Sequence, residues 1–367
     1  MTSTTRAASP PAATHHKDRI TTRRVPAEWA RHEATWIAWP HHEPDWPGKM
    51  EAIPWVYAEI VRVLHSHERV EILCHDERVR DAAVEVLNAH AVSPSGYRLH
   101  VVRTDRVWLR DSAPTFVWSE KGRVELINWR FNGWSKYDNF DADEKVGEEI
   151  EKITALRRSI ATRPDDRGEW LVLEGGGIET DGEGTLLVTE EWLLSDVQVR
   201  NPGMSRSDYE RAFGEYLGVT KTIWLGNGCV GDDTHGHIDD IARFAAPGVV
   251  LLAFEESASD ANHASSVDNL RRLEHAAGTQ SLRIVKLPYP RAIVMDGQRL
   301  PASYANFYIA NRVVIVPTFN APMDRVALSI IEREFPGREV VGIHAVDLVW
   351  GLGTLHCLTQ QQPAAAE

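Results

Sequence analysis

The chain has 367 residues, of which 43% are hydrophobic, and it carries 53 Asp and Glu against 40 Lys and Arg, a formal net charge of -13. A core of that size fits one large domain or two ordinary ones. The acidic balance disfavours nucleic acid and anionic membranes as partners, because those surfaces repel a negative protein, whereas a small cationic partner is electrostatically permitted.

The N-terminus of the chain differs from its body. Residues 1–20 lack the apolar run that a signal peptide or a membrane span needs, and their polar, Pro-containing composition predicts a disordered tail. From residue 21 to 367 no long linker or compositional break divides the sequence, so we expect a single domain. Three cysteines cannot build a disulfide framework, which favours a reducing compartment, the cytoplasm.

The body of the chain alternates short runs rich in β-branched residues with amphipathic stretches, a pattern typical of an α/β protein. The expected strands, in chain order, cover residues 70–74, 98–102, 115–118, 124–128, 171–173, 185–189, 222–225, 249–254, 283–287 and 312–317. Similar groups of strands and helices recur at a spacing of roughly 60 to 70 residues without a visible sequence repeat, which suggests structural pseudo-repetition.

Apolar residues at three- and four-residue spacing predict a helix over residues 51–66, because that spacing places them on one face. The residues on this face are Ile53, Tyr57, Ile60 and Leu64. A second helix is expected to begin near Ser207, whose Ser-x-x-Glu pattern with Glu210 is typical of a capping box, and to end at Gly218.

A third helix is expected after Pro322 and ends at Pro336 and Gly337, two residue types that interrupt helices. Its inward-facing residues are expected to be Val326, Ile330 and Phe335. The order of these helices and strands along the chain predicts an α/β or α+β fold class.

Two further places in the sequence could carry chemistry, but the residues there do not decide between a functional and a structural role. Arg110 and Asp111 lie between apolar runs beside a proline, where a surface ion pair is the simple interpretation and a ligand contact the alternative. Cys357 follows His356 near the end of the chain, so it is either a nucleophile or a small buried apolar residue. Cys74 ends the apolar run VEILC and is expected in the core.

In residues 171–191 a strand leads into Glu174 and three glycines, and a hairpin turn follows at Asp181 and Gly182. The glycines match neither the dinucleotide fingerprint nor the Walker A spacing, so a phosphate cradle is not expected. The segment is either an ordinary hairpin with an exposed carboxylate or a place where tight backbone lets Glu174 face a ligand.

Residues 232–240 contain two histidines and four acids, which packing alone does not explain, since buried charges and imidazoles require partners. His235, His237 and Asp239 alternate, and on an extended strand all three side chains would point to one side, as metal ligands often do. A metal-dependent hydrolase therefore remains one interpretation of this segment.

Six motifs together resemble the agmatine deiminase family, within the guanidine-modifying enzymes that include arginine deiminases and bacterial peptidylarginine deiminases. They are W-L-R-D at 108–111, L-E-G-G-G-I-E-T-D-G-E-G-T at 173–185, R-N-P at 200–202, G-D-D-T-H-G-H-I-D at 231–239, A-S-Y-A-N-F-Y-I-A-N at 302–311 and H-C-L-T-Q-Q-Q-P at 356–363. The resemblance implies an α/β fold of five pseudo-symmetric ββαβ units, a five-bladed propeller called the pentein fold. It also makes residues 21–367 a single deiminase catalytic domain.

The resemblance implies four catalytic residues. Cys357 matches the nucleophile, His237 the general acid and base, and Glu174 the acid of L-E-G-G, while Asp239 matches one carboxylate that holds the guanidinium. The implied reaction converts agmatine and water to N-carbamoylputrescine and ammonia through a thiouronium bound to the cysteine. No metal or organic cofactor is implied.

The resemblance also implies three substrate-binding residues. Asp111 matches the second carboxylate on the guanidinium, Asp233 matches an acid that binds a diamine substrate, and Trp108 walls the pocket. Carboxylates suit this task because a guanidinium presents a planar fork of N–H donors. The expected partner is a small cationic guanidino substrate, and a homodimer is possible.

Four positions depart from the usual family pattern: Arg106, Trp192, Leu352 and Thr354. Arg106 either turns outward or favours an anionic or longer guanidino substrate. The substrate therefore stays open between agmatine and another guanidino compound, such as arginine, a guanidino acid or peptidyl-arginine. A non-catalytic protein that binds guanidinium or polyamines is a further alternative.

Overall fold

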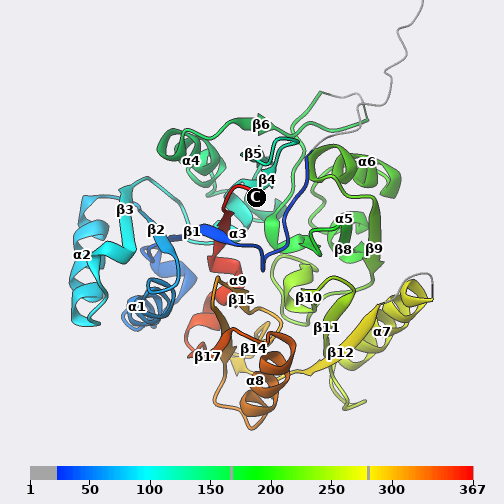
Figure 1. The fold of residues 1–367 in the computed structure, drawn as a ribbon. Coiled ribbons are helices and arrows are strands. Elements are labelled where there is room, and N and C mark those ends of the chain that lie inside the picture. Colours follow the sequence, from blue (N-terminus) through cyan, green and yellow to red (C-terminus); the bar gives the residue numbers. More distant parts are fainter. Residues whose placement is uncertain (1–22, 166–167, 279–281, 367) are drawn as a thin grey trace, which may run out of the picture.

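The computed structural model describes residues 23–165, 168–278 and 282–366, so the tail predicted over residues 1–20 lies outside the described residues. The short helices α3 (Leu109–Ser112) and α9 (Leu355–Leu358) lie near the middle of the molecule, and the longer helices lie around the outside (Figure 1). Sheets lie between them, which gives the mixed α/β fold that the sequence predicts.

Five sheets of the described chain share one pattern, in which a middle strand pairs antiparallel on one side and parallel on the other. In spatial order they are β18 (Gln360–Pro363), β1 (His32–Ala38), β2 (Arg69–Cys74) and β3 (Tyr97–Val101); β4 (Thr115–Trp118), β5 (Val124–Asn128) and β6 (Arg158–Ile160); β7 (Glu179–Thr180), β8 (Thr185–Thr189) and β9 (Lys221–Leu225); β10 (Ala242–Ala246), β11 (Val249–Phe254) and β12 (Arg283–Pro288); and β15 (Tyr308–Ile309), β16 (Val313–Thr318) and β17 (Glu339–His344). Strands β13 (Val294–Met295) and β14 (Gln298–Arg299) form a separate hairpin.

Each parallel pair is joined through a helix, as parallel strands require. The helices are α1 (Ile53–Leu64), α2 (Glu77–Ala89), α4 (Val146–Thr154), α5 (Glu190–Leu194), α6 (Arg206–Leu217), α7 (His263–Ala277) and α8 (Met323–Glu334). The middle strands of four sheets begin at Val124, Thr185, Val249 and Val313, so the pattern recurs roughly every 60 to 65 residues. This recurrence confirms the predicted pseudo-repetition.

Helix α1 confirms the first helix prediction, since all four residues of its predicted face are fully buried. The start of α6 was predicted from the wrong serine. Ser205 is the N-cap, and its capping box uses Asp208 in place of the predicted pair Ser207 and Glu210. The two patterns overlap, and only the backbone geometry distinguishes them. Gly218 ends α6 as expected, with φ at 69°.

Helix α8 follows Pro322 as predicted, but the residues that face the core differ from the predicted ones. Val326 is 44% exposed, so its predicted burial is wrong, whereas Ala327 and Ile331 are buried and Phe335 packs inward beyond the helix end. The predicted strand at 171–173 is also wrong, because only isolated bridges form there, such as that from Val172 to Arg130. The hairpin predicted at 181–182 is confirmed by β7 and β8.

The two ends of the described chain meet in one sheet. Strand β18 pairs antiparallel with β1, with Trp36 opposite Gln360 and His32 opposite Pro363. Because α9 immediately precedes β18, this pairing carries Cys357 to the middle of the molecule. The last strand of the chain therefore positions the candidate nucleophile.

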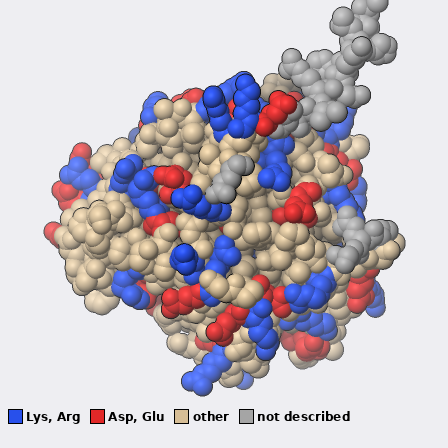
Figure 2. Space-filling view, viewed as in Figure 1, with Lys and Arg blue, Asp and Glu red and all other residues tan. Residues whose placement is uncertain are grey.

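Most apolar side chains pack into two buried clusters, and the three cysteines are all buried. Cys74 belongs to the core as predicted, and burial raises the pKa of its thiol to about 12. Acidic and basic residues are intermixed on the face shown in Figure 2. Across the described residues, no helix combines the length and the apolar character that a membrane crossing needs.

Candidate active site

Four short elements bring the predicted residues together. Asp111 lies on α3, Glu174 precedes the 3-10 helix η5 (Gly175–Gly177), Asp239 lies in η6 (Ile238–Asp240) just after His237, and Cys357 lies on α9. Helix α3 packs against both α9 and η5, and η5 packs against η6. Segments distant in the sequence therefore meet at one place near the centre.

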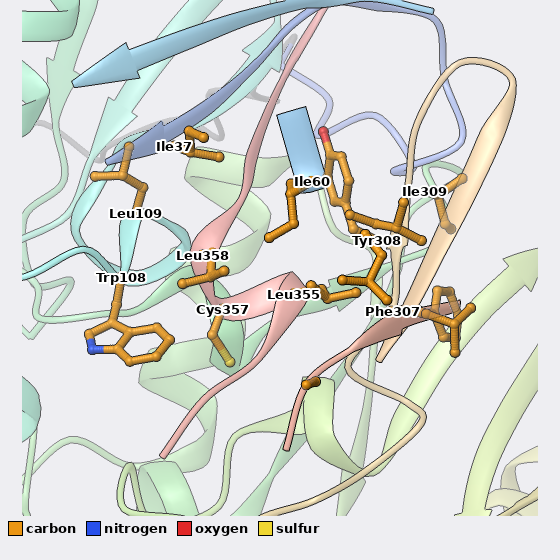
Figure 3. Packing of buried hydrophobic residues seen from close by; sticks show 14 of the residues in the cluster. Ile37, Ile60, Trp108, Leu109, Phe307, Tyr308, Ile309, Leu355, Cys357 and Leu358 are labelled. Atoms are coloured by element: carbon orange, nitrogen blue, oxygen red, sulfur yellow. The ribbon is translucent and has the colours of Figure 1, made fainter. Parts of the chain in front are cut away.

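The Cys357 thiol is buried beside polar groups. Asn306 Nδ2 donates to Cys357 Sγ at 3.1 Å, and Asp239 Oδ2 lies 3.6 Å from the same sulfur. Burial, followed by the charge of Asp239, raises the pKa of the thiol well above its usual value. Figure 3 shows Cys357 with Leu355 and Leu358, its apolar neighbours on α9. Near neutral pH this thiol is therefore protonated.

Gly353 forms a close approach near the thiol. A Cβ at this position would lie 2.7 Å from a ring carbon of Trp108 and 3.1 Å from Cys357 Cβ. Any larger residue would thus push apart the indole and the nucleophile. Trp108 consequently lies beside the nucleophile candidate and lines the same pocket.

His237 lies between two carboxylates. Its Nε2 is 3.4 Å from Glu174 Oε2, and its Nδ1 is 3.8 Å from Asp111 Oδ1. Burial lowers the pKa of the imidazole, but the charges of Asp111 and Glu174 outweigh burial and raise it to about 9. His237 is therefore a protonated imidazolium near neutral pH, which is the form that an acid requires.

Glu174 is a fully buried carboxylate with three partners. Arg200 Nε donates to its Oε1 at 3.0 Å, and Trp192 Nε1 donates to its Oε2 at 2.6 Å, the oxygen that also faces His237. Burial raises the pKa of this carboxyl, but Arg200 and His237 together lower it to about 2. Trp192, one of the departures from the family pattern, thus helps to hold the acid in place.

Asp111 points into the site while its neighbour Arg110 points away from it. Trp134 Nε1 donates to Asp111 Oδ2 at 2.9 Å and the backbone N–H of Gly176 donates to Oδ1 at 2.9 Å. Burial raises the pKa of Asp111 to about 6. Arg110 donates to Gln361 Oε1 at 2.6 Å and is buried, so the surface-pair interpretation is wrong.

A second glycine explains part of the motif after Glu174. A Cβ on Gly176 would lie 2.6 Å from His237 Nδ1 and 2.8 Å from Asp111 Oδ1. The backbone must come this close for its N–H to reach the Asp111 carboxylate. The glycine run therefore shapes the site and is more than a loose hairpin turn.

Behind Asp239 lies a buried relay that the sequence analysis missed. His356 Nδ1 is 2.7 Å from Asp239 Oδ2, and His356 Nε2 is 2.8 Å from Glu28 Oε2. Glu28 also pairs with Arg243 at 2.9 Å. Both ring nitrogens of His356 thus face carboxylate oxygens, which fixes the orientation of the ring between Asp239 and Glu28. The His before the cysteine was visible in the sequence, but nothing pointed to Glu28, which lies 328 residues away.

The other oxygen of Asp239 is left free for a ligand. Asp239 is completely buried, and across the residues that the structure describes its Oδ1 has no hydrogen-bond partner. The pKa of Asp239 is lowered because His356 outweighs the cost of burial. An ionised, unpartnered oxygen beside a thiol is a binding point for a cationic donor.

A pocket of about 370 Å³ opens over these groups. Of the seven predicted site residues, four line it: Trp108, Asp111, Asp233 and Cys357. Glu174, His237 and Asp239 lie behind them. The structure thus brings all seven predicted positions to one site, with carboxylates at its base.

Three further departures from the family pattern also adjoin this site. Arg106 lines the pocket and pairs with Asp45 at 2.5 Å, so its side chain does not turn outward. Leu352 lines the pocket too, in a left-handed backbone with φ at 69°. Thr354 Oγ1 donates to Asn306 Oδ1 at 2.7 Å, which holds the amide beside the thiol.

The strand on which the metal interpretation depends does not form. His235 has a left-handed backbone with φ at 65° and its Nε2 contacts Ser195 Oγ at 3.0 Å, while Asp239 lies in the short helix η6. The three side chains therefore do not alternate along one strand face, and that prediction is wrong. In residues 23–165, 168–278 and 282–366 no group of three or more His, Cys, Asp or Glu is placed to hold a metal ion.

Fold and site together define a member of a deiminase family. The chain belongs to the Porphyromonas-type peptidyl-arginine deiminase family, whose model matches residues 24–363. An agmatine deiminase of Pseudomonas aeruginosa (strain LESB58) is 35% identical, over 93% of this chain and 95% of that protein. A putative agmatine deiminase of Latilactobacillus sakei subsp. sakei (strain 23K) is also 35% identical, over 93% of this chain and 96% of its own.

Solved structures agree with this placement. The agmatine deiminase of Enterococcus faecalis superposes with a TM-score of 0.85 at 29% identity, covering 94% of this chain and 97% of that one. A putative arginine deiminase from Porphyromonas gingivalis gives a TM-score of 0.81 at 32% identity, covering 94% and 99%. The family resemblance expected from the six motifs is therefore confirmed.

Proposed function

We propose that this protein is an agmatine deiminase, a hydrolase that converts agmatine and water to N-carbamoylputrescine and ammonia. The observation that carries the proposal is the arrangement at the base of the pocket, where a buried thiol adjoins Asp239 and an imidazolium lies between Asp111 and Glu174. The agmatine deiminases among its relatives, similar along nearly their whole length, support the same assignment.

The base of the pocket suits a planar cation. Asp239 Oδ1 has no hydrogen-bond partner among the described residues, and Asp111 is held by Trp134 at the edge of the same cavity. Two carboxylates bind a guanidinium through its fork of N–H donors and thereby orient its central carbon. We assign Asp111 and Asp239 this role, which fixes the carbon in front of Cys357.

The cation also activates the thiol. After burial, the charges of Asp239, Asp240 and Asp111 raise the pKa of Cys357, and a guanidinium bound by Asp239 and Asp111 neutralises two of these three charges. The thiol then releases its proton to solvent, and the thiolate forms a C–S bond to the guanidinium carbon. The electron pair of the former C=N bond moves to nitrogen, which gives a neutral tetrahedral adduct.

His237 supplies and later recovers a proton. As an imidazolium it protonates one amino group of the adduct, the C–N bond breaks, ammonia leaves, and a thiouronium cation remains on Cys357. Neutral His237 then takes a proton from water while the oxygen bonds to the same carbon. The C–S bond then breaks with its electron pair leaving on sulfur as the thiolate, the hydroxyl group passes its proton to solvent, and the C=O bond of the ureido product forms. Glu174 orients His237 through these steps and favours its charged form before and after them.

The wider description of the protein follows the same proposal. The five sheets with one shared pairing pattern support a five-bladed propeller of ββαβ units, in which residues 21–367 form a single catalytic domain. We further propose a cytoplasmic enzyme without metal or organic cofactor that takes a small cationic substrate. A homodimer is compatible with this proposal.

Arg106 is the observation that favours a second candidate, the hydrolysis of a guanidino acid, because it places a cation in the pocket wall. Its charge is already balanced by Asp45, so we rank agmatine first. A substrate panel of agmatine, arginine, 4-guanidinobutyrate and a peptidyl-arginine decides between them, with ammonia and ureido product measured together. Agmatine is expected to give the highest kcat/KM.

The Cys357→Ala protein is the control for the covalent mechanism. It is expected to bind agmatine, measured by calorimetry, without releasing ammonia. Turnover by this variant would remove the thiol from the mechanism, and binding without turnover in the wild type would favour the non-catalytic alternative.

A further inference from the structure

An indole N–H lies on the carboxylate oxygen that faces the proton donor. Trp192 Nε1 donates to Glu174 Oε2 at 2.6 Å, and His237 Nε2 lies 3.4 Å from the same oxygen. The other oxygen of Glu174 accepts from Arg200 Nε at 3.0 Å. Each oxygen therefore has a nearer donor than His237, and the shorter of two hydrogen bonds to one charged acceptor is the stronger.

The indole is fixed in this place by its surroundings. Trp192 is 1% exposed, and a Cβ on Gly177 would lie 2.4 Å from its ring, so the backbone of η5 lies directly against the indole. Thr189 Oγ1 accepts from the backbone N–H of Trp192 at 3.1 Å and donates to the backbone oxygen of Gly236 at 2.5 Å. Because Gly236 precedes His237, one threonine ties the indole to the segment that carries the imidazole.

Four carboxylates act on His237, and each of them favours its charged form. Asp111 and Glu174 face its two ring nitrogens at 3.8 Å and 3.4 Å. Asp232 accepts from its backbone N–H at 2.9 Å, and Asp239 attracts it from η6. Burial lowers the pKa of the imidazole, but the carboxylates, Asp111 first, outweigh burial and raise it to about 9. A general acid works best when its pKa lies near the working pH, so a group that limits this stabilisation favours proton transfer.

We propose that Trp192 is a positioning residue that limits how strongly Glu174 holds the proton on His237. The indole N–H occupies Glu174 Oε2, draws negative charge away from the imidazole and keeps the two side chains from closing into a short ion pair. His237 therefore gives its proton to the leaving amine more readily. The inference rests on the proposed deiminase activity and goes beyond it, since Trp192 lies behind the residues that line the pocket and acts through Glu174.

The test is Trp192→Phe, which keeps an aromatic ring against Gly177 and removes the N–H donor. Glu174 Oε2 then faces His237 alone. We expect the alkaline limb of kcat for agmatine to move to higher pH by about half a unit, because only part of a lost hydrogen bond to a charged group is passed on to the imidazole.

The plateau of kcat should move as well. It should fall about two- to five-fold in Trp192→Phe, since a proton that is held more tightly is given up more slowly. KM for agmatine should stay within about two-fold, because the substituted side chain lies outside the pocket. The measurement is ammonia release against agmatine concentration between pH 6 and pH 11. An alkaline limb that stays in place, or that moves to lower pH, overturns the proposal.

Trp129→Phe is the matched control. Trp129 belongs to the same buried cluster as Trp192, and its Nε1 donates to the hydroxyl of Thr115 at 2.8 Å, not to a carboxylate. We expect this variant to lower the melting temperature about as much as Trp192→Phe and to leave the alkaline limb in place. Equal shifts of the limb in both variants would indicate a general loosening of the fold and would contradict the proposal.

A double variant tests whether Trp192 acts through Glu174. In a Glu174→Gln background, Trp192→Phe should move the alkaline limb by about 0.2 pH unit at most, because the charge on which the indole acts is gone. A shift as large as that in the wild-type background would mean that the indole acts on His237 directly, which refutes the proposal. Trp192→Met also lacks the donor and fills the space flexibly, so it replaces Trp192→Phe if that variant does not fold.

A direct titration of His237 keeps this inference separate from the proposed function. Isotope-labelled histidine reports each imidazole by NMR, and the signal of His237 is the one that His237→Gln lacks. If the wild type releases no ammonia, the deiminase proposal fails, yet an upward shift of the His237 titration in Trp192→Phe still supports the role of the indole. An unchanged His237 titration refutes that role, with or without deiminase activity.

Discussion

Replacing Glu174 with Gln tests the link between a buried carboxylate and the proton on His237. The substitution keeps the shape of the side chain and removes the negative charge that faces His237 Nε2 at 3.4 Å. We expect the variant to retain activity at low pH and to lose it at a lower pH than the wild type on the alkaline side. The reason is that kcat needs the imidazolium as the proton donor.

The size of the effect follows from the raised pKa of His237. A rise from 6.5 to about 9 corresponds to about 3 kcal/mol between the two protonation states. Asp111 makes the largest favourable contribution, and Glu174 acts through both a hydrogen bond and its charge. Removing Glu174 should therefore lower the alkaline limb of kcat by about one pH unit, on the order of 1.4 kcal/mol.

The assay is ammonia release at saturating agmatine between pH 6 and pH 10, so that kcat is read apart from KM. Loss of the charge also leaves Arg200 without its carboxylate, which costs stability on its own. Glu179→Gln is a matched control, because Glu179 forms a similar buried pair with Arg243 at 2.9 Å and does not face His237. An alkaline limb that stays in place in Glu174→Gln, or moves equally in Glu179→Gln, would refute the reasoning.

Three further outcomes are expected. Because the pKa of His237 is raised in the folded protein, its protonated form stabilises the fold fully below pH 6.5, and this stabilisation is lost as the pH rises through about 9. The melting temperatures of the wild type and of His237→Gln should therefore converge above that pH. Glu28→Gln removes the carboxylate that holds His356 Nε2 at 2.8 Å, so the contact of His356 with Asp239 should loosen, the pKa of Asp239 should rise, and the acid limb of kcat/KM should move to higher pH; an unmoved limb would exclude the relay. Ser205→Ala should lower the free energy of unfolding in urea by about 1 kcal/mol, and the neighbouring Ser207→Ala by a few tenths at most.

Patterns within a short stretch of sequence predicted those features that depend on neighbouring residues alone, such as which side chains share one face of a helix. The stripe from Ile53 to Leu64 identified a buried helix face, since the spacing alone fixes which side chains share a face. The same reasoning was wrong at Val326, because which face of α8 turns inward depends on the strands it packs against. The start of α6 shows the same limit, because Ser205 and Ser207 have similar capping patterns two residues apart and the sequence alone does not tell which one is the N-cap.

The residues of the candidate site were predicted through motifs, and their partners were not. Cys357, His237 and Glu174 each lie in a recognisable run, whereas Glu28 and Arg243 lie in segments without unusual composition. Their importance comes from the fold, which buries Glu28 between His356 and Arg243. A buried ion pair between distant segments leaves no local pattern, so only the three-dimensional arrangement reveals it.

The pairing of β18 with β1 has a consequence for synthesis of the protein. In chain order, α9 and β18 follow all the other helices and strands of the described residues, so a ribosome makes those elements before it adds the candidate nucleophile Cys357. Until β18 emerges, the edge of β1 stays unpaired and the thiol has no fixed place beside Asp239. Chains that lack α9 and β18 are therefore expected to be inactive. The active site becomes complete in the same step in which β18 pairs with β1 and completes the first sheet.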